Sequence, residues 1–220
     1  MRIDDGARPY RAVIFDLGGV VLGSPLHAIA AYEREIGIPA NFINRVVMDT
    51  APTGAWSRLE RGELSMEAFY RAFDRECAEA GCEISALAMM ERISASTGPR
   101  PAMLEAVTRI RGQGLAVAAL TNNWASEPSE PSETPSHSEL RDLFDVFIES
   151  SVEGLRKPDP KIYQRACQRL SVAPDQAIFL DDIGANLKPA RQLGMTTIKV
   201  VTPEAALAEL QSLLGFSLTG

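Results

Sequence analysis

The stretch "YRAVIFDLGGVVLG", residues 10–23, decides the fold because it joins an apolar run to a single acid and a glycine pair. Residues 12–15 are all apolar and predict a short buried strand. Asp16 stands at the carboxyl end of this strand, and Gly18 and Gly19 permit a flexible turn after it. A lone carboxylate at the tip of a buried strand, followed by such a turn, indicates a functional position.

Further short apolar runs alternate with helical patterns along the rest of the chain. Near-continuous apolar runs of this length are typical of a parallel sheet that is covered on both faces. The strands are expected over 115–120, 146–150, 177–181 and 196–201, and the helices over 101–114, 159–172, 184–194 and 202–215. This alternation predicts an α/β fold with a doubly wound, mostly parallel, Rossmann-like sheet of five to six strands.

One block interrupts the alternation, since residues 24–98 contain no convincing strand. Helical patterns are expected there over 25–37, 39–50, 54–81 and 84–96. We therefore predict a core domain made of residues 9–23 and 99–216 and a helical cap domain, 24–98, inserted after the first strand. Residues 126–138 are dominated by Ser, Glu and Pro and predict a surface loop without an assigned role.

The composition excludes several classes of protein. The 220 residues carry a net charge of −7 and are 45% hydrophobic, which indicates a soluble globular protein and disfavours nucleic-acid binding. The apolar runs are too short for a membrane span, and residues 1–11 contain no apolar signal core. Cys77, Cys82 and Cys167 lack zinc spacing and are expected to be reduced thiols, which suggests a cytoplasmic location. The oligomeric state stays open.

Two familiar kinds of catalytic centre are also disfavoured. The chain has only two histidines, His27 at the start of the insert and His137 in the Ser/Glu/Pro segment, and both are expected to be ordinary exposed side chains. A Ser-His-Asp triad is therefore not expected. The sequence also lacks the GxxxxGK pattern of a nucleotide-binding P-loop.

Polar side chains follow the predicted strands at the edge where a parallel sheet binds ligands. Each has an ordinary explanation as a cap, a turn residue or a solvated lysine, but adjacent acids such as Asp181 and Asp182 indicate that a positive group lies nearby. Jointly they indicate one site. The set is Asp16, Thr121, Asn122, Asn123, Lys157, Asp181, Asp182 and Asn186.

The types of residue in this set favour an anionic substrate held by a hard divalent cation. Two aspartates and a backbone carbonyl suit Mg²⁺, which keeps several waters and binds through one or two carboxylates. A carboxylate that attacks a phosphate about 4 Å away faces roughly 4 kcal/mol of repulsion at an effective dielectric constant near 20. Mg²⁺ and Lys157 would cancel that charge, and Thr121 with nearby amides would hold the phosphoryl oxygens.

These residues and their order resemble the haloacid dehalogenase (HAD) superfamily, whose members are mostly Mg²⁺-dependent phosphatases. The segments "VIFDLGGV", "LTNN", "RKPDP" and "FLDDIGANL" look like its four motifs in sequence, and the insert looks like its cap. More closely, "FIESSVEGLRKPDPKIY" and "IFLDDIGANLKPARQLGM" resemble two kinds of HAD-type domain. One is the N-terminal phosphatase domain of soluble epoxide hydrolase, and the other is the HAD-type domain of multidomain acyl-CoA dehydrogenases.

The resemblance implies a metal-assisted nucleophile. Asp16 would be the nucleophile and would form an aspartyl-phosphate. Its other carboxylate oxygen, the Gly18 carbonyl and Asp182 would ligate Mg²⁺. Asp181 would act beside the metal, and Asn186 would orient the ligands from behind them.

The resemblance also assigns the phosphoryl-binding residues and reveals one departure. Thr121 and Asn122 would bind the transferring phosphoryl group of a small phosphorylated substrate, Asn123 would support them, and Lys157 would neutralise charge and hold Asp16. Family phosphatases usually carry a second Asp where this chain has Gly18. Metal ligation through the carbonyl would survive, but a general acid–base group, typically worth about 10²–10⁴-fold in rate, is missing.

Two alternatives stay open beside a slow or leaving-group-selective phosphatase. A 2-haloacid dehalogenase also lacks the second Asp but needs no metal, and the adjacent acid pair argues against it. A non-catalytic regulatory or binding domain would keep the fold and the metal. In the cap, Trp56, Arg58, Tyr70 and Phe73 are candidates to line the site, although aromatic residues at helical spacing are more often core.

Overall fold

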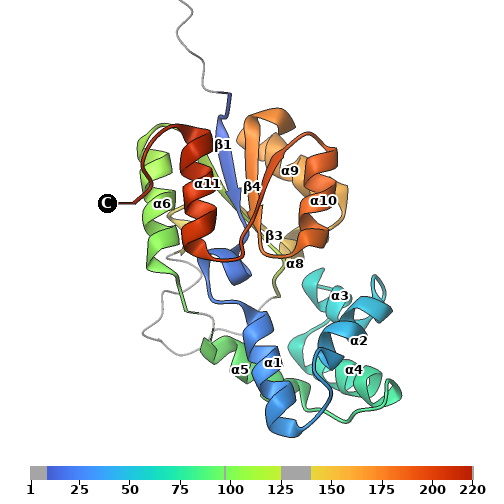
Figure 1. Cartoon of the computed structure of the whole chain (residues 1–220). Coiled ribbons are helices and arrows are strands. Elements are labelled where there is room, and N and C mark those ends of the chain that lie inside the picture. Colours follow the sequence, from blue (N-terminus) through green and yellow to red (C-terminus); the bar gives the residue numbers. More distant parts are fainter. Residues whose placement is uncertain (1–8, 97, 125–139, 220) are drawn as a thin grey trace, which may run out of the picture.

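The computed structural model describes residues 9–96, 98–124 and 140–219. The predicted loop 126–138, with His137, lies outside these residues. Within them, a five-stranded parallel sheet has the order β3-β2-β1-β4-β5, which confirms the predicted α/β class (Figure 1). The strands are β1 (Ala12–Phe15), β2 (Ala116–Thr121), β3 (Val146–Glu149), β4 (Ala177–Asp181) and β5 (Thr196–Lys199).

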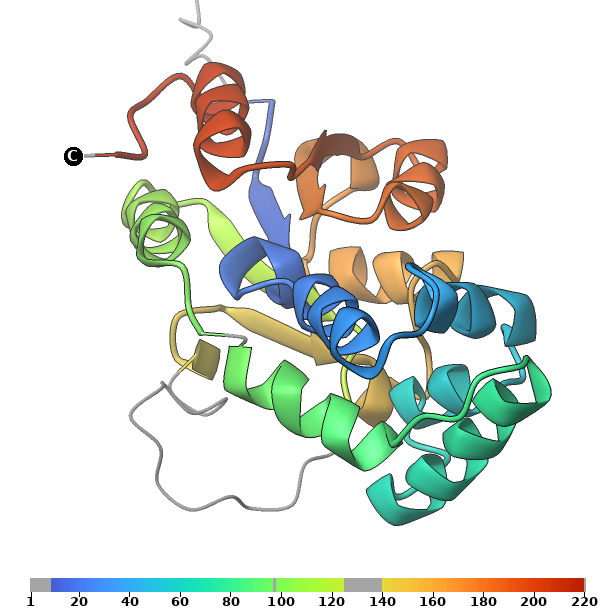
Figure 2. The same ribbon diagram turned by 60° about the horizontal axis from the view of Figure 1, so that its bottom comes forward.

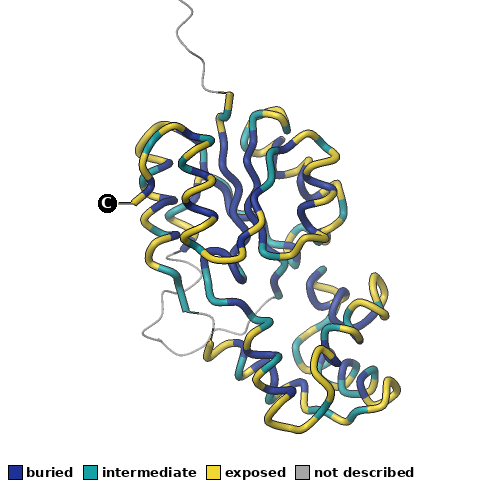
Figure 3. Tube along the Cα trace, in the orientation of Figure 1, coloured by how far each residue is buried: buried dark blue, intermediate teal, exposed yellow. Residues whose placement is uncertain are grey.

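Helices cover both faces of the sheet. Side chains alternate between the faces of a strand, so Val13 and Phe15 pack on one side of β1 and Ile14 on the other. The first side is covered by α6 (Pro101–Gly112) and α11 (Pro203–Leu214), and the second by α9 (Pro160–Leu170) and α10 (Gly184–Gln192). The three central strands, β1, β2 and β4, are consequently almost wholly buried, as Figure 3 shows, whereas the edge strands β3 and β5 are partly exposed. Two short helical elements lie in the connections of the sheet: α8 (Ser150–Glu153) follows β3, and η2 (Pro174–Gln176) precedes β4.

The remaining helices form a separate body beside the carboxyl ends of the strands (Figures 1 and 2). They pack around a hydrophobic cluster of their own, distinct from the two clusters that flank the sheet. The boundaries of the predicted cap, 24–98, stay a prediction that this separate cluster supports. The helices are α1 (Pro25–Ile36), α2 (Phe42–Thr50), α3 (Ala55–Glu60), α4 (Met66–Glu79) and α5 (Ala86–Ser96).

Two chain segments, around Gly23 and around Gly98, connect this helical body to the sheet. Gly23 donates its N–H to the Gly98 carbonyl at 2.8 Å, and Arg100 donates to the Val21 carbonyl at 2.8 Å. The segments therefore run side by side. The first follows η1 (Leu17–Val21), a tight turn directly after β1 in which Gly19 has a φ of 80°. The Arg100 guanidinium donates to the Gly19 carbonyl at 2.7 Å and fixes this turn.

The prediction of one helix over 54–81 is wrong, because the structure has two, α3 and α4, joined by residues 61–65. Gly62 takes a φ of 71° there, and a Cβ at this position would lie 2.4 Å from the Ser151 carbonyl oxygen. Ser65 then begins α4 by accepting a hydrogen bond from the Ala68 N–H. Among the described residues, no helix is long and apolar enough to span a bilayer.

Candidate active site

The strand order places the predicted site residues together. β1 lies between β2 and β4, with Phe15 in register with Ala119 and Leu180. The Asp16 N–H continues the ladder by donating to the Leu180 carbonyl at 2.9 Å. Asp16 therefore emerges beside the carboxyl ends of both neighbouring strands, where Thr121 and Asp181 stand.

Lys157 binds two of the acids at once. Its Nζ lies 2.8 Å from Asp16 Oδ1 and 2.7 Å from Asp181 Oδ2, and its side chain is 1% exposed. Burial disfavours the ammonium form, but the two carboxylates outweigh it and raise the pKa of Lys157. Asp181 is held further by the Ile183 N–H at 2.8 Å and by Asn186 Nδ2, 3.1 Å from each carboxylate oxygen. This network fixes Asp16 next to a permanent positive charge.

Asp16, Asp181 and Asp182, the acid trio, each offer a carboxylate oxygen within 4.8 Å of those of the other two. Burial raises the pKa of Asp16 to about 8, and the other two acids add to the effect, although Lys157 opposes it. Burial and Asp181 also raise the pKa of Asp182. Three acids therefore share a space with one lysine, which leaves an excess of negative charge.

The surroundings of Asp182 suit a cation. Its Oδ1 is buried and has no hydrogen-bond partner in the described part of the chain, while Oδ2 receives a weak bond from Ser24 Oγ at 3.4 Å. Gly19 gives this side chain its room, since a Cβ there would lie 2.1 Å from Asp182 Oδ2. An unpaired buried carboxylate oxygen beside two other acids is the donor set of a metal site. The acid trio can therefore hold a metal ion.

The second motif is held in place by its amides. Asn122 Oδ1 accepts from the Lys157 N–H at 2.8 Å, and its Nδ2 donates to the Lys157 carbonyl at 3.0 Å. Its side chain thus positions the lysine segment. Asn123 instead binds Glu149 at 2.7 Å and Ser151 at 2.9 Å, which ties β2 to the end of β3. Thr121 is buried and lines the same cavity as Asp16.

Gly18 lies in this cavity with ordinary backbone angles, φ −64° and ψ 122°. A Cβ there would meet its nearest neighbour, Pro25 Cδ, at 3.4 Å, which is a normal van der Waals contact. The glycine is therefore not required by the conformation of the backbone, and the position has room for a Cβ.

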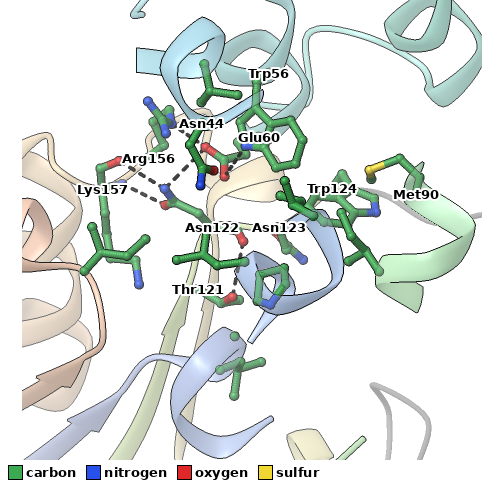
Figure 4. Close-up of a pocket in the computed structure, with 18 of the residues that line it drawn as sticks. Asn44, Trp56, Glu60, Met90, Thr121, Asn122, Asn123, Trp124, Arg156 and Lys157 are labelled. Carbon is green, nitrogen blue, oxygen red and sulfur yellow. Dashed lines mark hydrogen bonds and ion pairs between the residues drawn. The ribbon is translucent and has the colours of Figure 1, made fainter. Parts of the chain in front are cut away.

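A partly buried ion pair between the cap and the loop after α8 was not anticipated from the sequence. Glu60 of α3 accepts from Arg156 Nε at 2.5 Å and from Trp56 Nε1 at 3.0 Å (Figure 4). Arg156 Nη1 also donates to Ser57 Oγ at 3.1 Å. Burial raises the pKa of Glu60, although the positive charge of Arg156 acts to lower it. Because Arg156 directly precedes Lys157, the pair fastens the cap beside the lysine. The partners are 96 positions apart, and no local pattern in the sequence links them.

The cavity has a volume of about 1160 Å³ and reaches from the acid trio into the cap. Trp56 and Tyr70 line it, as predicted. The other two candidates do not line it, and Phe73 takes the core role that is more common for aromatic residues at helical spacing. Arg58 is directed to solvent beside Glu63, with 3.6 Å between their charged atoms, and Phe73 is fully buried in the cap, stacked on Phe69.

Known proteins match both the chain and its fold. The profile of the haloacid dehalogenase-like hydrolases covers residues 10–194. The chain belongs to this family. It is therefore a hydrolase of the HAD superfamily, and the resemblance carried by its four motifs is confirmed.

Curated relatives of the HAD domain include parts of larger proteins. Mouse acyl-CoA dehydrogenase family member 10 is 42% identical over 97% of this chain, which spans 20% of that protein. Pig bifunctional epoxide hydrolase 2 is 33% identical over 94% of the chain, which spans 39% of it. Sesquiterpene phosphatase astK of Aspergillus oryzae is 28% identical over 94% of the chain and 97% of its own length.

Solved structures share the HAD fold at low sequence identity. A HAD-like family hydrolase from Porphyromonas gingivalis has a TM-score of 0.67 at 22% identity, covering 94% of this chain and 98% of its own. A HAD family enzyme from Bacteroides thetaiotaomicron, in complex with magnesium and inorganic phosphate, has a TM-score of 0.59 at 18% identity. That comparison covers 86% of this chain and 93% of the other.

Proposed function

We propose that the protein is a Mg²⁺-dependent phosphatase that hydrolyses a phosphorylated metabolite through an aspartyl-phosphate on Asp16. The observation that carries the proposal is the position of Asp16, held at 2.8 Å by Lys157 and beside the unpaired oxygen of Asp182. The phosphatase named among the relatives spans 94% of this chain, and a protein of the same fold binds magnesium and phosphate. Both findings support this reading.

The residues that would hold Mg²⁺ are Asp16, Asp182 and the backbone carbonyl of Gly18. Carboxylate and carbonyl oxygens are the ligands that this hard cation prefers. When bound, the ion would neutralise charge on the phosphoryl oxygens and favour the ionised form of Asp16, whose pKa is otherwise about 8. Asp181 is already occupied by Lys157 and Asn186, so it acts on the site by fixing the lysine.

In the first step, a carboxylate oxygen of Asp16 attacks phosphorus. A bond forms between them, and the bond from phosphorus to the leaving oxygen breaks with both electrons going to that oxygen. Thr121 and the neighbouring amides hold the phosphoryl oxygens, and Lys157 balances their charge. Because Gly18 carries no carboxyl group, the leaving oxygen takes its proton from water. In the second step water attacks phosphorus, and the bond from phosphorus to Asp16 breaks with both electrons returning to the carboxylate. The attacking water loses its proton to the solvent, which balances the proton taken up by the leaving oxygen, and inorganic phosphate departs.

The acid trio disfavours dehalogenation of 2-haloacids. Such a substrate is itself a carboxylate, and it would meet three acids within 4.8 Å of one another with one lysine between them. Two unit charges at about 5 Å repel by roughly 3 kcal/mol at an effective dielectric constant of 20. The alternative of a non-catalytic binding domain predicts metal binding without turnover, which separates it from the phosphatase.

The test is turnover of acetyl phosphate and 4-nitrophenyl phosphate with Mg²⁺ and with EDTA. We expect phosphate release only with Mg²⁺, and none from Asp16→Asn, whereas the control Asp175→Asn, at an exposed acid outside the cavity, keeps full activity. A single turnover in H₂¹⁸O would place the label in phosphate during the second step. Chloride release from 2-chloropropionate without Mg²⁺, or Mg²⁺ binding without any phosphate release, would contradict the proposal.

A further inference from the structure

The cavity beyond the acid trio is walled mainly by hydrocarbon. It continues from Asp16, Thr121 and Asp182 between the cap helices, where α1, α2, α4 and α5 supply apolar side chains. Its volume of about 1160 Å³ exceeds the roughly 300–1,000 Å³ of typical ligand sites. Examples from the four helices are Leu26, Ile29, Val47, Met66, Tyr70 and Met90.

We propose that the group esterified to phosphate in the natural substrate is an extended, uncharged hydrocarbon body that occupies this cavity. The inference rests on the proposed phosphatase function and names the class of its substrate. The cavity is continuous with the acid trio, so a phosphate seated there directs the rest of its molecule toward the cap. Removing apolar surface from water stabilises the complex by about 25 cal/mol per Å².

A pair of tryptophans forms the wall nearest the polar end. Trp56 from the cap and Trp124 from the segment after β2 lie with their ring centroids 6.0 Å apart at 75° (Figure 4). Trp56 is held in one orientation by its hydrogen bond to Glu60 at 3.0 Å. Beside Asp182, Ile183 leaves 41% of its surface exposed and also lines the cavity. Apolar contact thus begins directly beside the predicted phosphoryl site.

Three methionines of the cap helices also line the cavity. Met48, Met66 and Met90 come from three different cap helices. Methionine is unbranched and has a polarisable sulfur, so it adapts to ligands of different shape. Met48 stands at the rim, where 76% of its surface is exposed. These side chains favour tolerance of straight and branched hydrocarbon over recognition of one rigid shape.

The charges of the cavity disfavour a second anionic group on the substrate. Among the described residues, the cations that line it are Arg156 and Lys157, and each is paired with carboxylates, Arg156 with Glu60 and Lys157 with Asp16 and Asp181. Two further acids, Glu67 and Glu91, line the cap side. A carboxylate or a second phosphate at the far end of the substrate would therefore be repelled.

The proposal is tested with phenyl, 4-butylphenyl and 4-octylphenyl phosphates below their critical micelle concentrations. A para-alkyl group barely changes the leaving phenol, so kcat/KM reports contact with the cavity. Each buried methylene is worth up to about fourfold. We expect kcat/KM to rise at least tenfold from phenyl to octylphenyl. A flat or falling series, with phenyl phosphate still hydrolysed, would overturn the proposal and leave the phosphatase standing.

Binding provides a readout that does not need turnover. Calorimetry with Mg²⁺ should show octylphosphonate binding at least tenfold more tightly than ethylphosphonate, and 8-phosphonooctanoate more weakly than octylphosphonate. If no phosphate ester is hydrolysed but this order holds, the catalytic proposal fails and the cavity inference stands. Equal binding of the octyl and ethyl probes, or tighter binding of the carboxylate, overturns the inference.

A matched pair of variants locates the binding surface. Met48→Asp introduces a charge at the cavity rim. Val201→Asp introduces one outside the cavity, at a residue whose surface is also 76% exposed. We expect Met48→Asp to lower the octylphenyl-to-phenyl ratio of kcat/KM at least threefold. Val201→Asp should leave the ratio unchanged. An equal effect of both variants would contradict binding of the hydrocarbon along the cap.

Discussion

Replacing Lys157 by methionine removes the buried positive charge and keeps a side chain of similar length. Lys157 contacts Asp16 at 2.8 Å and Asp181 at 2.7 Å. Without it, the carboxylate oxygens of the acid trio still lie within 4.8 Å of one another, but no ammonium group lies between them. At that separation each pair of charges repels by about 3.5 kcal/mol for an effective dielectric constant of 20. Proton uptake relieves part of this, so we expect a loss of about 3–5 kcal/mol in the free energy of unfolding.

In a chain of this size, 1 kcal/mol corresponds to about 2–4 °C in Tm, so the loss in EDTA should be about 6–20 °C. Mg²⁺ should restore more stability to Lys157→Met than it adds to the wild type, because the ion supplies the missing positive charge. Turnover should fall to background with or without Mg²⁺. Thermal unfolding monitored by circular dichroism measures the effect, with the exposed Lys161→Met as control. A Lys157→Met protein as stable in EDTA as the wild type would refute the electrostatic reasoning.

Three further predictions concern the residues around the metal site. Gly18→Asp should raise turnover of alkyl phosphates by 10-fold or more, since its backbone angles accept a side chain and a proton donor is worth about 10²–10⁴-fold; an unchanged rate would mean that another group supplies the proton. For the wild type, aryl and acyl phosphates should be hydrolysed faster than alkyl phosphates, and equal rates would remove the reason for the Gly18 prediction. Gly19→Ala should abolish Mg²⁺ binding measured by calorimetry, because its Cβ would fall 2.1 Å from Asp182 Oδ2 and its φ is +80°, whereas Gly112→Ala, where nothing lies within 4 Å, should bind normally.

Metal-free protein should also show a characteristic dependence of stability on pH. The pKa of Asp16 is raised from 3.8 to about 8, so between these values the native state holds a proton that the unfolded chain releases. The contribution of this residue to the free energy of unfolding therefore falls as pH rises from about 4 to about 8. Asp16→Asn should remove that part of the slope in urea titrations in EDTA. An identical slope in both proteins would contradict the raised pKa.

The sequence predicted the sheet because its signal is local. The three central strands are short apolar runs, and their burial on both faces follows from helices on each side. The convergence of Asp16, Thr121 and Asp181 follows from the same pattern, since parallel strands place their carboxyl ends at one edge. The contact of Lys157 with Asp16 was expected from family resemblance, whereas its simultaneous contact with Asp181 needed coordinates.

Other features depend on how the cap sits on the sheet, which no local pattern encodes. The break between α3 and α4 arises where Gly62 approaches the Ser151 carbonyl, a residue distant in sequence. The pairing of Glu60 with Arg156 joins the same two bodies. Likewise, Phe73 and Tyr70 are three positions apart on one helix, yet only Tyr70 lines the cavity. Helical periodicity identifies an apolar face but not which neighbour covers it.

The separate hydrophobic cluster of the cap has a consequence for divergence among relatives. Because α1 to α5 bury their own side chains around one centre, and the sheet packs around two others, a substitution among the cap residues that face the cavity leaves the two clusters of the sheet intact. New leaving groups can thus be accommodated by exchanging a few cap side chains while the strand that bears Asp16 stays paired on both edges. The strand residues that carry the reaction and the cap residues that select the leaving group can therefore evolve at different rates.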